Sequence, residues 1–177
     1  MNVHPDTATH ALLEAAAFDS VASAKACVDD LLAAGFVGDD ISVFCSDDEV
    51  RKRFPDLHAE LPGPSKTGGV LGALFGGSLG AIVGVTGLAT LGGLPVVVAG
   101  GLASVLAGGV MGGLTGAMVE RGLTADAADF YDQAVQDGKL LVAVAVDEDG
   151  AQRRQQRIAD VRRIFADHDA ERSPNAS

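Results

Sequence analysis

The chain has 177 residues, which is enough for one domain with its own hydrophobic core or for a small domain with an insertion. Its composition is 47% hydrophobic but only 5% aromatic, with 23 glycines and no tryptophan, so the apolar side chains are small and aliphatic. The formal net charge of −11 argues against binding to nucleic acid and against electrostatic adhesion to anionic lipid, since both need clustered lysine and arginine.

The first part of the chain predicts a strand, a helix and a second strand. Residues 1–9 carry no apolar pattern and are expected to form a disordered tail. The run HALLEAAAF favours a short strand, although its alanines suit a helix equally well. The run DSVASAKACVDDLLAAGF predicts a helix with Ser20 as N-cap and Gly35 just beyond its end. The run DDISVFCS then alternates as a strand does.

The middle of the chain changes composition abruptly. Residues 47–66 are charged and rich in proline, which predicts a short helix over Asp47–Phe54 and then a linker. Residues 67–119 contain no Asp, Glu, Lys, Arg, His, Asn or Gln, and they hold 17 of the 23 glycines. The predicted division is a tail (1–9), the first part of an α/β domain with its linker (10–66), an apolar hairpin (67–119), the second part of the domain (120–172) and a tail (173–177).

The final third returns to the pattern of a folded domain. Thr124 can cap a helix through ADAADFYDQAVQD, which Gly138 ends, and KLLVAVAV is the strongest strand signal in the chain. The charged run AQRRQQRIADVRRIFADH predicts a helix with one apolar face, and a weak last strand is expected near residues 169–172. Without the middle segment, this order predicts an α+β fold, a ferredoxin-like sandwich interrupted by an insertion.

Small residues recur at every fourth position in the middle segment. The first run is Gly68, Gly72, Gly76, Gly80 and Gly84, and the second is Gly100, Ser104, Gly108, Gly112 and Gly116. Small side chains four apart allow two helices in lipid to pack backbone to backbone. The spacing therefore predicts a glycine-zipper hairpin with helical arms Gly68–Leu91 and Pro95–Val119, each about 36 Å long and sufficient for a hydrocarbon core of about 30 Å.

The position of this hairpin relative to a membrane stays open at this point. Lys66 and Arg121 flank it, so the positive-inside rule places the rest of the chain in the cytoplasm. The first arm has only ten residues of the Val, Leu, Ile and Phe class, which favour insertion by roughly 3–6 kcal/mol. The arms could span the bilayer as a packed pair or lie at its interface. Alternatively, they could pack in water as a two-helix core or an oligomer interface.

Four stretches of the sequence resemble a known family when taken in order: AFDSVASAKACVDDLLAAGFVGDDISVF, KTGGVLGALFGGSLGAIVG, GLPVVVAGGLASVLAGGVMGGLTGAM and GLTADAADFYDQAVQDGKLLVAV. Over about residues 10–170 the chain is similar to the bacterial general-stress and low-temperature-induced proteins. The resemblance implies a glycine-rich apolar hairpin inside a small α/β domain, induction by stress and frequent membrane association, with no catalytic residues to transfer. The chain departs from the family pattern in its weak final strand.

The sequence carries no motif for a catalytic, cofactor or metal site. Neither a GxxxxGK[ST] phosphate loop nor a GxGxxG fingerprint occurs, and no two of the four histidines have zinc-ligand spacing. Cys27 and Cys45 lie in apolar runs and are expected to be buried free thiols, while Tyr131 is expected to pack on its helix.

The sequence therefore predicts a non-enzymatic, membrane-associated stress protein. Its hairpin would anchor it in lipid and drive homo-oligomer formation, and its cytoplasmic α/β domain would sense or contact a partner other than nucleic acid. The alternative is a soluble oligomeric module that binds a ligand or regulates a partner, in which the hairpin is an oligomer interface. The ligand of such a module is unknown.

Overall fold

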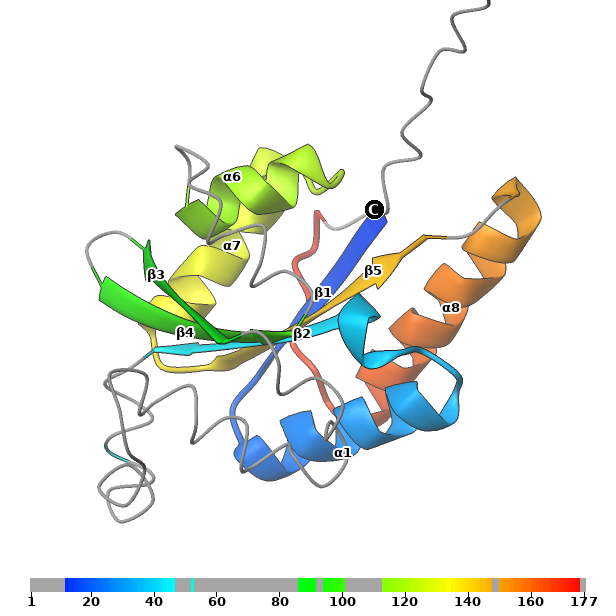
Figure 1. Cartoon of the computed structure of the whole chain (residues 1–177), viewed down its shortest axis with the longest axis horizontal. Helices are drawn as coiled ribbons and strands as arrows, with labels where there is room; N and C mark the ends of the chain where they lie inside the picture. Colours follow the sequence, from blue (N-terminus) through cyan, green and yellow to red (C-terminus); the bar gives the residue numbers. More distant parts are fainter. Residues whose placement is uncertain are drawn as a thin grey trace, which may run out of the picture.

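The computed structural model describes residues 12–46, 52, 86–91, 94–100, 113–147 and 150–175 (Figure 1). In chain order its elements are β1 (Leu12–Phe18), α1 (Val21–Ala33), the short 3-10 helix η1 (Gly38–Asp40), β2 (Ile41–Ser46), β3 (Thr86–Leu91), β4 (Leu94–Gly100), α6 (Gly113–Glu120), α7 (Ala125–Gln136), β5 (Leu140–Val146) and α8 (Ala151–Asp167). The predicted helix over 47–54 lies outside these residues apart from Lys52.

The five strands form one antiparallel sheet with the order β1-β5-β2-β4-β3. The pairing of β1 with β5 runs without a bulge from Leu12↔Val146 to Phe18↔Leu140. Helices α1 and α8 cover one face of the sheet, and α6 and α7 cover the other (Figure 1). The structure is therefore a mixed α+β fold, as the sequence predicted.

Both faces of the central strands are buried. In β2, Ile41, Val43 and Cys45 belong to the core under α1 and α8, whereas Phe44 belongs to the core under α6 and α7. Successive side chains of β2 thus point alternately into two hydrophobic cores, and not alternately into a core and into solvent. In β5, Leu140, Val142, Val144 and Val146 join the first core and Leu141 and Ala143 the second. Such burial explains why β5 reads as a continuous apolar run.

The predicted boundaries of α1 and α7 are confirmed by the residues that cap these helices. Ser20 Oγ accepts the backbone N–H of Ser23 at 3.0 Å and begins α1, and Thr124 Oγ1 accepts the N–H of Ala127 at 3.2 Å and begins α7. Gly35 and Gly138 follow the two helices with φ of +86° and +89°, a conformation that costs glycine little. The apolar stripes predicted for α1 and α8 face the same core.

Arg157 fastens α8 to the end of α1. Its Nη1 and Nη2 donate to the carbonyls of Ala34 and Gly35 at 3.0 and 3.2 Å, and its guanidinium lies 3.6 Å from the centre of the Phe36 ring. The carbonyls at a helix C-terminus lack partners within the helix, and a cation there is favoured by the helix dipole. One side chain therefore completes α1 and joins the two helices that cover this face.

The predicted helical hairpin is wrong over residues 86–91 and 94–100, which are strands β3 and β4 of the sheet. β-Branched residues favour strands, and Val96, Val97 and Val98 stand together in β4. Leu91 pairs with Leu94, and the sequence between them is Gly-Gly, a pair that short hairpin loops prefer. The other parts of the two arms, residues 68–85 and 101–112, lie outside the described residues.

Helix α6 is the described remainder of the second arm. Its Leu114 and Met118 are buried in the core shared with α7. Over the described ranges, no helix combines the length and the apolar character that crossing a membrane requires. The helical end of the charge-free segment is thus packed on the domain.

We expect Arg157→Ala to lower the free energy of unfolding by about 1–2 kcal/mol, because the two carbonyls lose their donor and Phe36 loses its cation. Urea unfolding followed by circular dichroism measures the change. Arg153→Ala, at an exposed site of the same helix, is the matched control and should stay within about 0.5 kcal/mol of the wild type. Equal values for the two variants would contradict the assigned role of Arg157.

Candidate functional site

The predicted helix-packing residues are not assembled into a helical seam where they are described. Gly100 ends β4 and pairs with Ser42 of β2, so it is not in a helix. Gly116 lies in a helix, α6, where a Cβ atom built on it meets nothing within 4 Å, and its contact with the first arm stays a prediction. The other predicted positions, Gly68, Gly72, Gly76, Gly80, Gly84, Ser104, Gly108 and Gly112, lie outside the described residues.

The most distinctive polar group in the described structure is the carboxylate of Glu14. It sits in the middle of β1 and is only 6% exposed. Arg162 of α8 donates to it with Nε at 3.0 Å and Nη2 at 2.7 Å, a bidentate geometry. Arg172 donates to the same carboxylate with Nη2 at 3.1 Å. Hydrogen bonding to Glu14 raises the pKa of Arg162.

Two guanidinium groups compensate this buried carboxylate. An ion removed from water loses several kcal/mol of solvation, which is recovered only when charged partners and hydrogen bonds replace the water. The bidentate Arg162 comes from the helix that covers β1, and Arg172 comes from the segment that follows this helix. Sequence reasoning missed all three residues; the one available signal was a lone charged residue within the apolar run LLEAAAF.

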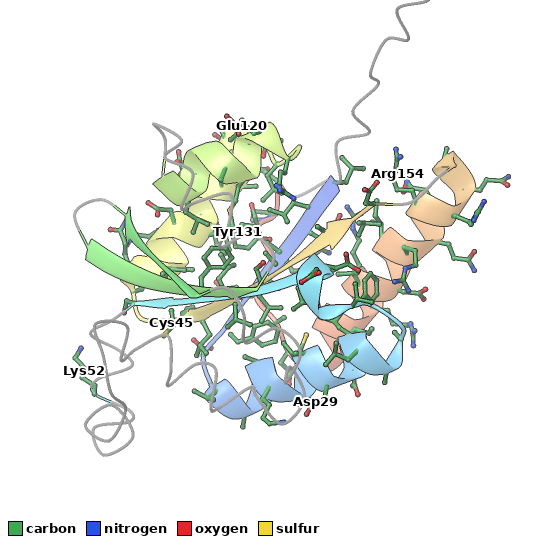
Figure 2. All side chains as sticks on the ribbon, viewed as in Figure 1. Asp29, Cys45, Lys52, Glu120, Tyr131 and Arg154 are labelled. Atoms are coloured by element: carbon green, nitrogen blue, oxygen red, sulfur yellow. The ribbon has the colours of Figure 1, made fainter. Side chains whose placement is uncertain are left out.

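Tyr131 joins the second core to the edge of the sheet. Its ring is fully buried, and Figure 2 shows it between α7 and the sheet. The phenol donates to the carbonyl of Ala15 at 2.6 Å and accepts the N–H of Ser173 at 3.2 Å. Burial raises the pKa of Tyr131, while the N–H of Ser173 acts in the opposite direction. The predicted packing role is confirmed, and the hydroxyl adds a link across the molecule.

These contacts hold residues 169–175, called here the C-terminal strap, along the outer edge of β1. Ala17 and Glu171 exchange two backbone hydrogen bonds of 2.8 Å, the single bridge that stands where a weak last strand was expected. Lys139 contacts both Asp19 and Glu171, which raise its pKa chiefly through hydrogen bonding by Glu171.

The end of the strap also differs from the sequence prediction. Residues 173–177 were expected to be a disordered tail, but Ser173 is buried and bonded to Tyr131. Thr124 Oγ1 donates to the carbonyl of Asn175 at 3.3 Å, and the Asn175 N–H donates to Ser173 Oγ at 3.3 Å. The ordered structure of the domain therefore continues at least to Asn175.

In this arrangement the Glu14 and Tyr131 side chains connect separate elements of the fold. The Glu14 carboxylate is engaged by two cations, and the Tyr131 phenol by two backbone groups. Cys27 and Cys45 are buried thiols outside any disulfide, as predicted, and burial raises the pKa of the Cys27 thiol to about 12. No group of three His, Cys, Asp or Glu side chains that could hold a metal ion occurs in the described part of the chain.

We expect Tyr131→Phe to destabilise the protein by about 1–3 kcal/mol, because the Ala15 carbonyl and the Ser173 N–H both lose a buried partner. Urea unfolding gives the stability, and hydrogen exchange should show faster exchange at the Ser173 amide. Gln133→Ala, on the exposed side of α7, is the control. A tyrosine variant as stable as this control would show that the hydroxyl carries no structural role.

We expect Cys27 to make the protein less stable in alkali. The pKa of its thiol is about 12 in the folded chain against an ordinary value of 9.0, so the native state holds this proton more tightly. The associated stability is complete below pH 9 and falls as pH rises from about 9 to 12, by up to about 1.4 kcal/mol per pH unit. Cys27→Ala should remove that slope from urea unfolding measured across this range. An unchanged slope would contradict the assignment.

Comparison with known proteins gives no further constraint on this site. No family model matches the sequence, and neither the curated proteins nor the solved structures give a significant match. The function proposed next rests on the residues and their arrangement.

Proposed function

We propose that this chain is a non-enzymatic interaction protein of the stress-response type, in which an α+β domain presents a charge-free segment for self-association. The observation that carries the proposal is the position of residues 86–91 and 94–100. They form β3 and β4 of the domain's own sheet, and residues 113–119 of the same segment lie in α6, packed on α7. The segment is thus fastened to the domain at several points along its length.

The arrangement of the other elements supports a ferredoxin-like core within this domain. The chain forms two strand-helix-strand units, β1-α1-β2 and β5-α8 followed by the bridge at Glu171. Across the sheet their order is Glu171, β1, β5 and β2. Helices α1 and α8 lie on the same face. In this proposal the fourth strand is reduced to the bridge at Glu171. The residues between β2 and β5 then supply strands β4 and β3 at one end of the sheet. They also supply helices α6 and α7 on the face opposite to α1 and α8.

Charge favours the segment as the place where copies meet. Two chains that each carry a formal charge of −11 repel one another over most of their surface. Residues 67–119 carry no ionisable side chain, so contacts through them avoid this repulsion. Strand β3 belongs to this segment and lies at the end of the sheet, where no further strand pairs with it among the described residues. An edge strand offers its backbone donors and acceptors to a second chain.

Membrane association remains the second candidate, favoured by the apolar composition of the same segment, by Lys66 and Arg121 at its two ends and by the family resemblance. In this case residues 67–85 and 101–112 would contact lipid while β3 and β4 stay in the sheet, and the domain would face the cytoplasm.

The two candidates predict different behaviour of the full chain. We expect the protein purified without detergent to be an oligomer by light scattering, with at least twice the chain mass of 17.9 kDa. Thr86→Lys with Thr90→Lys, which puts two charges on β3, should yield monomers. Leu12→Lys changes an exposed apolar residue of β1 and should leave the oligomer intact.

Vesicle flotation completes the test. A wild-type monomer that floats with vesicles of neutral and anionic phospholipid would overturn self-association and support the membrane candidate. A wild-type monomer that stays with the soluble fraction would overturn both candidates.

A further inference from the structure

We propose that β3 of one chain pairs antiparallel with β3 of a second copy about a two-fold axis at Leu88. The inference rests on the self-association proposed above and adds the edge, the partner and the register of the contact. Strand β3 lies at one end of the five-stranded sheet, so this pairing would join two such sheets into one continuous sheet.

The hydrogen bonds at the opposite edge fix which backbone groups of the sheet point outward. Leu13 of β1 donates its N–H to the Arg121 carbonyl, and Ala17 exchanges two bonds with Glu171. In an antiparallel ladder, the N–H and C=O of one residue point to the same side, and those of the next residue point to the other side. The odd-numbered residues of β1 therefore point out of the sheet, and the even-numbered residues bond β5.

The registers carry this alternation across the sheet to β3. All four ladders are antiparallel, and none of them skips a residue. The hydrogen-bonded pairs that result include, in order from β1 to β3, Glu14↔Val144, Leu141↔Phe44, Cys45↔Val97 and Val98↔Gly87. On β3 the odd-numbered residues thus bond β4, and the backbone groups that point outward belong to Thr86, Leu88 and Thr90.

Pro95 of β4 provides an independent check of this assignment. It stands opposite Thr90 of β3. A hydrogen-bonded pair exchanges two bonds, and proline has no N–H to give, so this pair must be one without hydrogen bonds. The alternation requires the same, since it directs the backbone groups of Thr90 away from β4. Both routes therefore assign the same residues to the outer edge.

An axis at Leu88 pairs all three outward residues of β3. It places Leu88 opposite Leu88 of the second copy, and Thr86 of each chain opposite Thr90 of the other. Each of these pairs exchanges two hydrogen bonds. With the axis moved by one residue, to Gly87 or Ala89, one threonine of each chain would stand opposite a residue outside β3. The register at Leu88 is thus the one that uses the whole edge.

The sequence of β3 suits a partner identical to itself. A two-fold contact is self-complementary. Residues 86–90 read TGLAT, with threonine at both ends and leucine at the centre, and opposed threonines are a favourable cross-strand pair. The strand has no proline and no charged residue, two of the features that protect natural edge strands. It also lies in the charge-free segment, where two copies of this acidic chain repel each other least.

Amide hydrogen exchange of the unmodified chain, resolved by residue and measured at several concentrations, tests which edge pairs. We expect the three outward amides of β3 to exchange at least about tenfold more slowly in the oligomer than in the dilute monomer. The odd-numbered amides of β3 bond β4 in both states and should change much less. An oligomer whose outward amides gain no protection would overturn this inference and leave self-association standing. A chain that stays monomeric at every concentration would overturn both.

Cysteine cross-linking tests the register. Thr86→Cys and Thr90→Cys chains, when co-expressed, should form a disulfide-linked dimer on mild oxidation, because Cα atoms of a hydrogen-bonded pair lie about 5.5 Å apart. Either variant alone should not, since equal positions are separated by four residues, or about 13 Å along the strands. The unmodified chain, with Cys27 and Cys45 buried, is the control. Linkage of one variant with itself, or an oligomer without mixed linkage, would overturn the axis at Leu88.

Discussion

The structure depends on the burial of both faces of β5. This strand lies between β1 and β2, and its side chains enter two separate hydrophobic cores. Apolar side chains on two faces need two covering layers, since burial of apolar area is the dominant favourable term in folding. Helices α1 and α8 form one layer. The other layer is α6 and α7, of which α6 lies mostly within the charge-free segment. Helix α6, at the end of the charge-free segment, is therefore part of the domain's core.

Much of the fold could be predicted from periodicity and caps. The ends of α1 and α7 could be located because capping is a local property of a few residues. The residues that marked them are Ser20, Gly35, Thr124 and Gly138. The failure over residues 86–100 has a physical cause. Helical and strand periods are told apart by polar residues, which mark the solvent side, and this segment contains almost none. Regular glycines then suggested helices, although the run Val96–Val98 favoured a strand.

The candidate site could not be predicted in the same way, because its partners are brought together only by the complete fold. Glu14 is separated in sequence by 148 residues from Arg162 and by 158 from Arg172. Tyr131 was correctly expected in a core, but its hydroxyl bonds a carbonyl 116 residues away. No local pattern encodes such distances. A charged residue in an apolar strand predicts that a partner exists without saying where it is.

The burial of Cys27 has a consequence for the chemistry of the chain under oxidising conditions. Oxidants attack the thiolate, and because burial raises the pKa of Cys27 to about 12, the thiol is held in its protonated form at pH 7. Burial therefore protects Cys27 in the native domain, and unfolding exposes its sulfur. Oxidation would then act selectively on unfolded chains, and a sulfinic or sulfonic acid formed there would prevent their return to the native core.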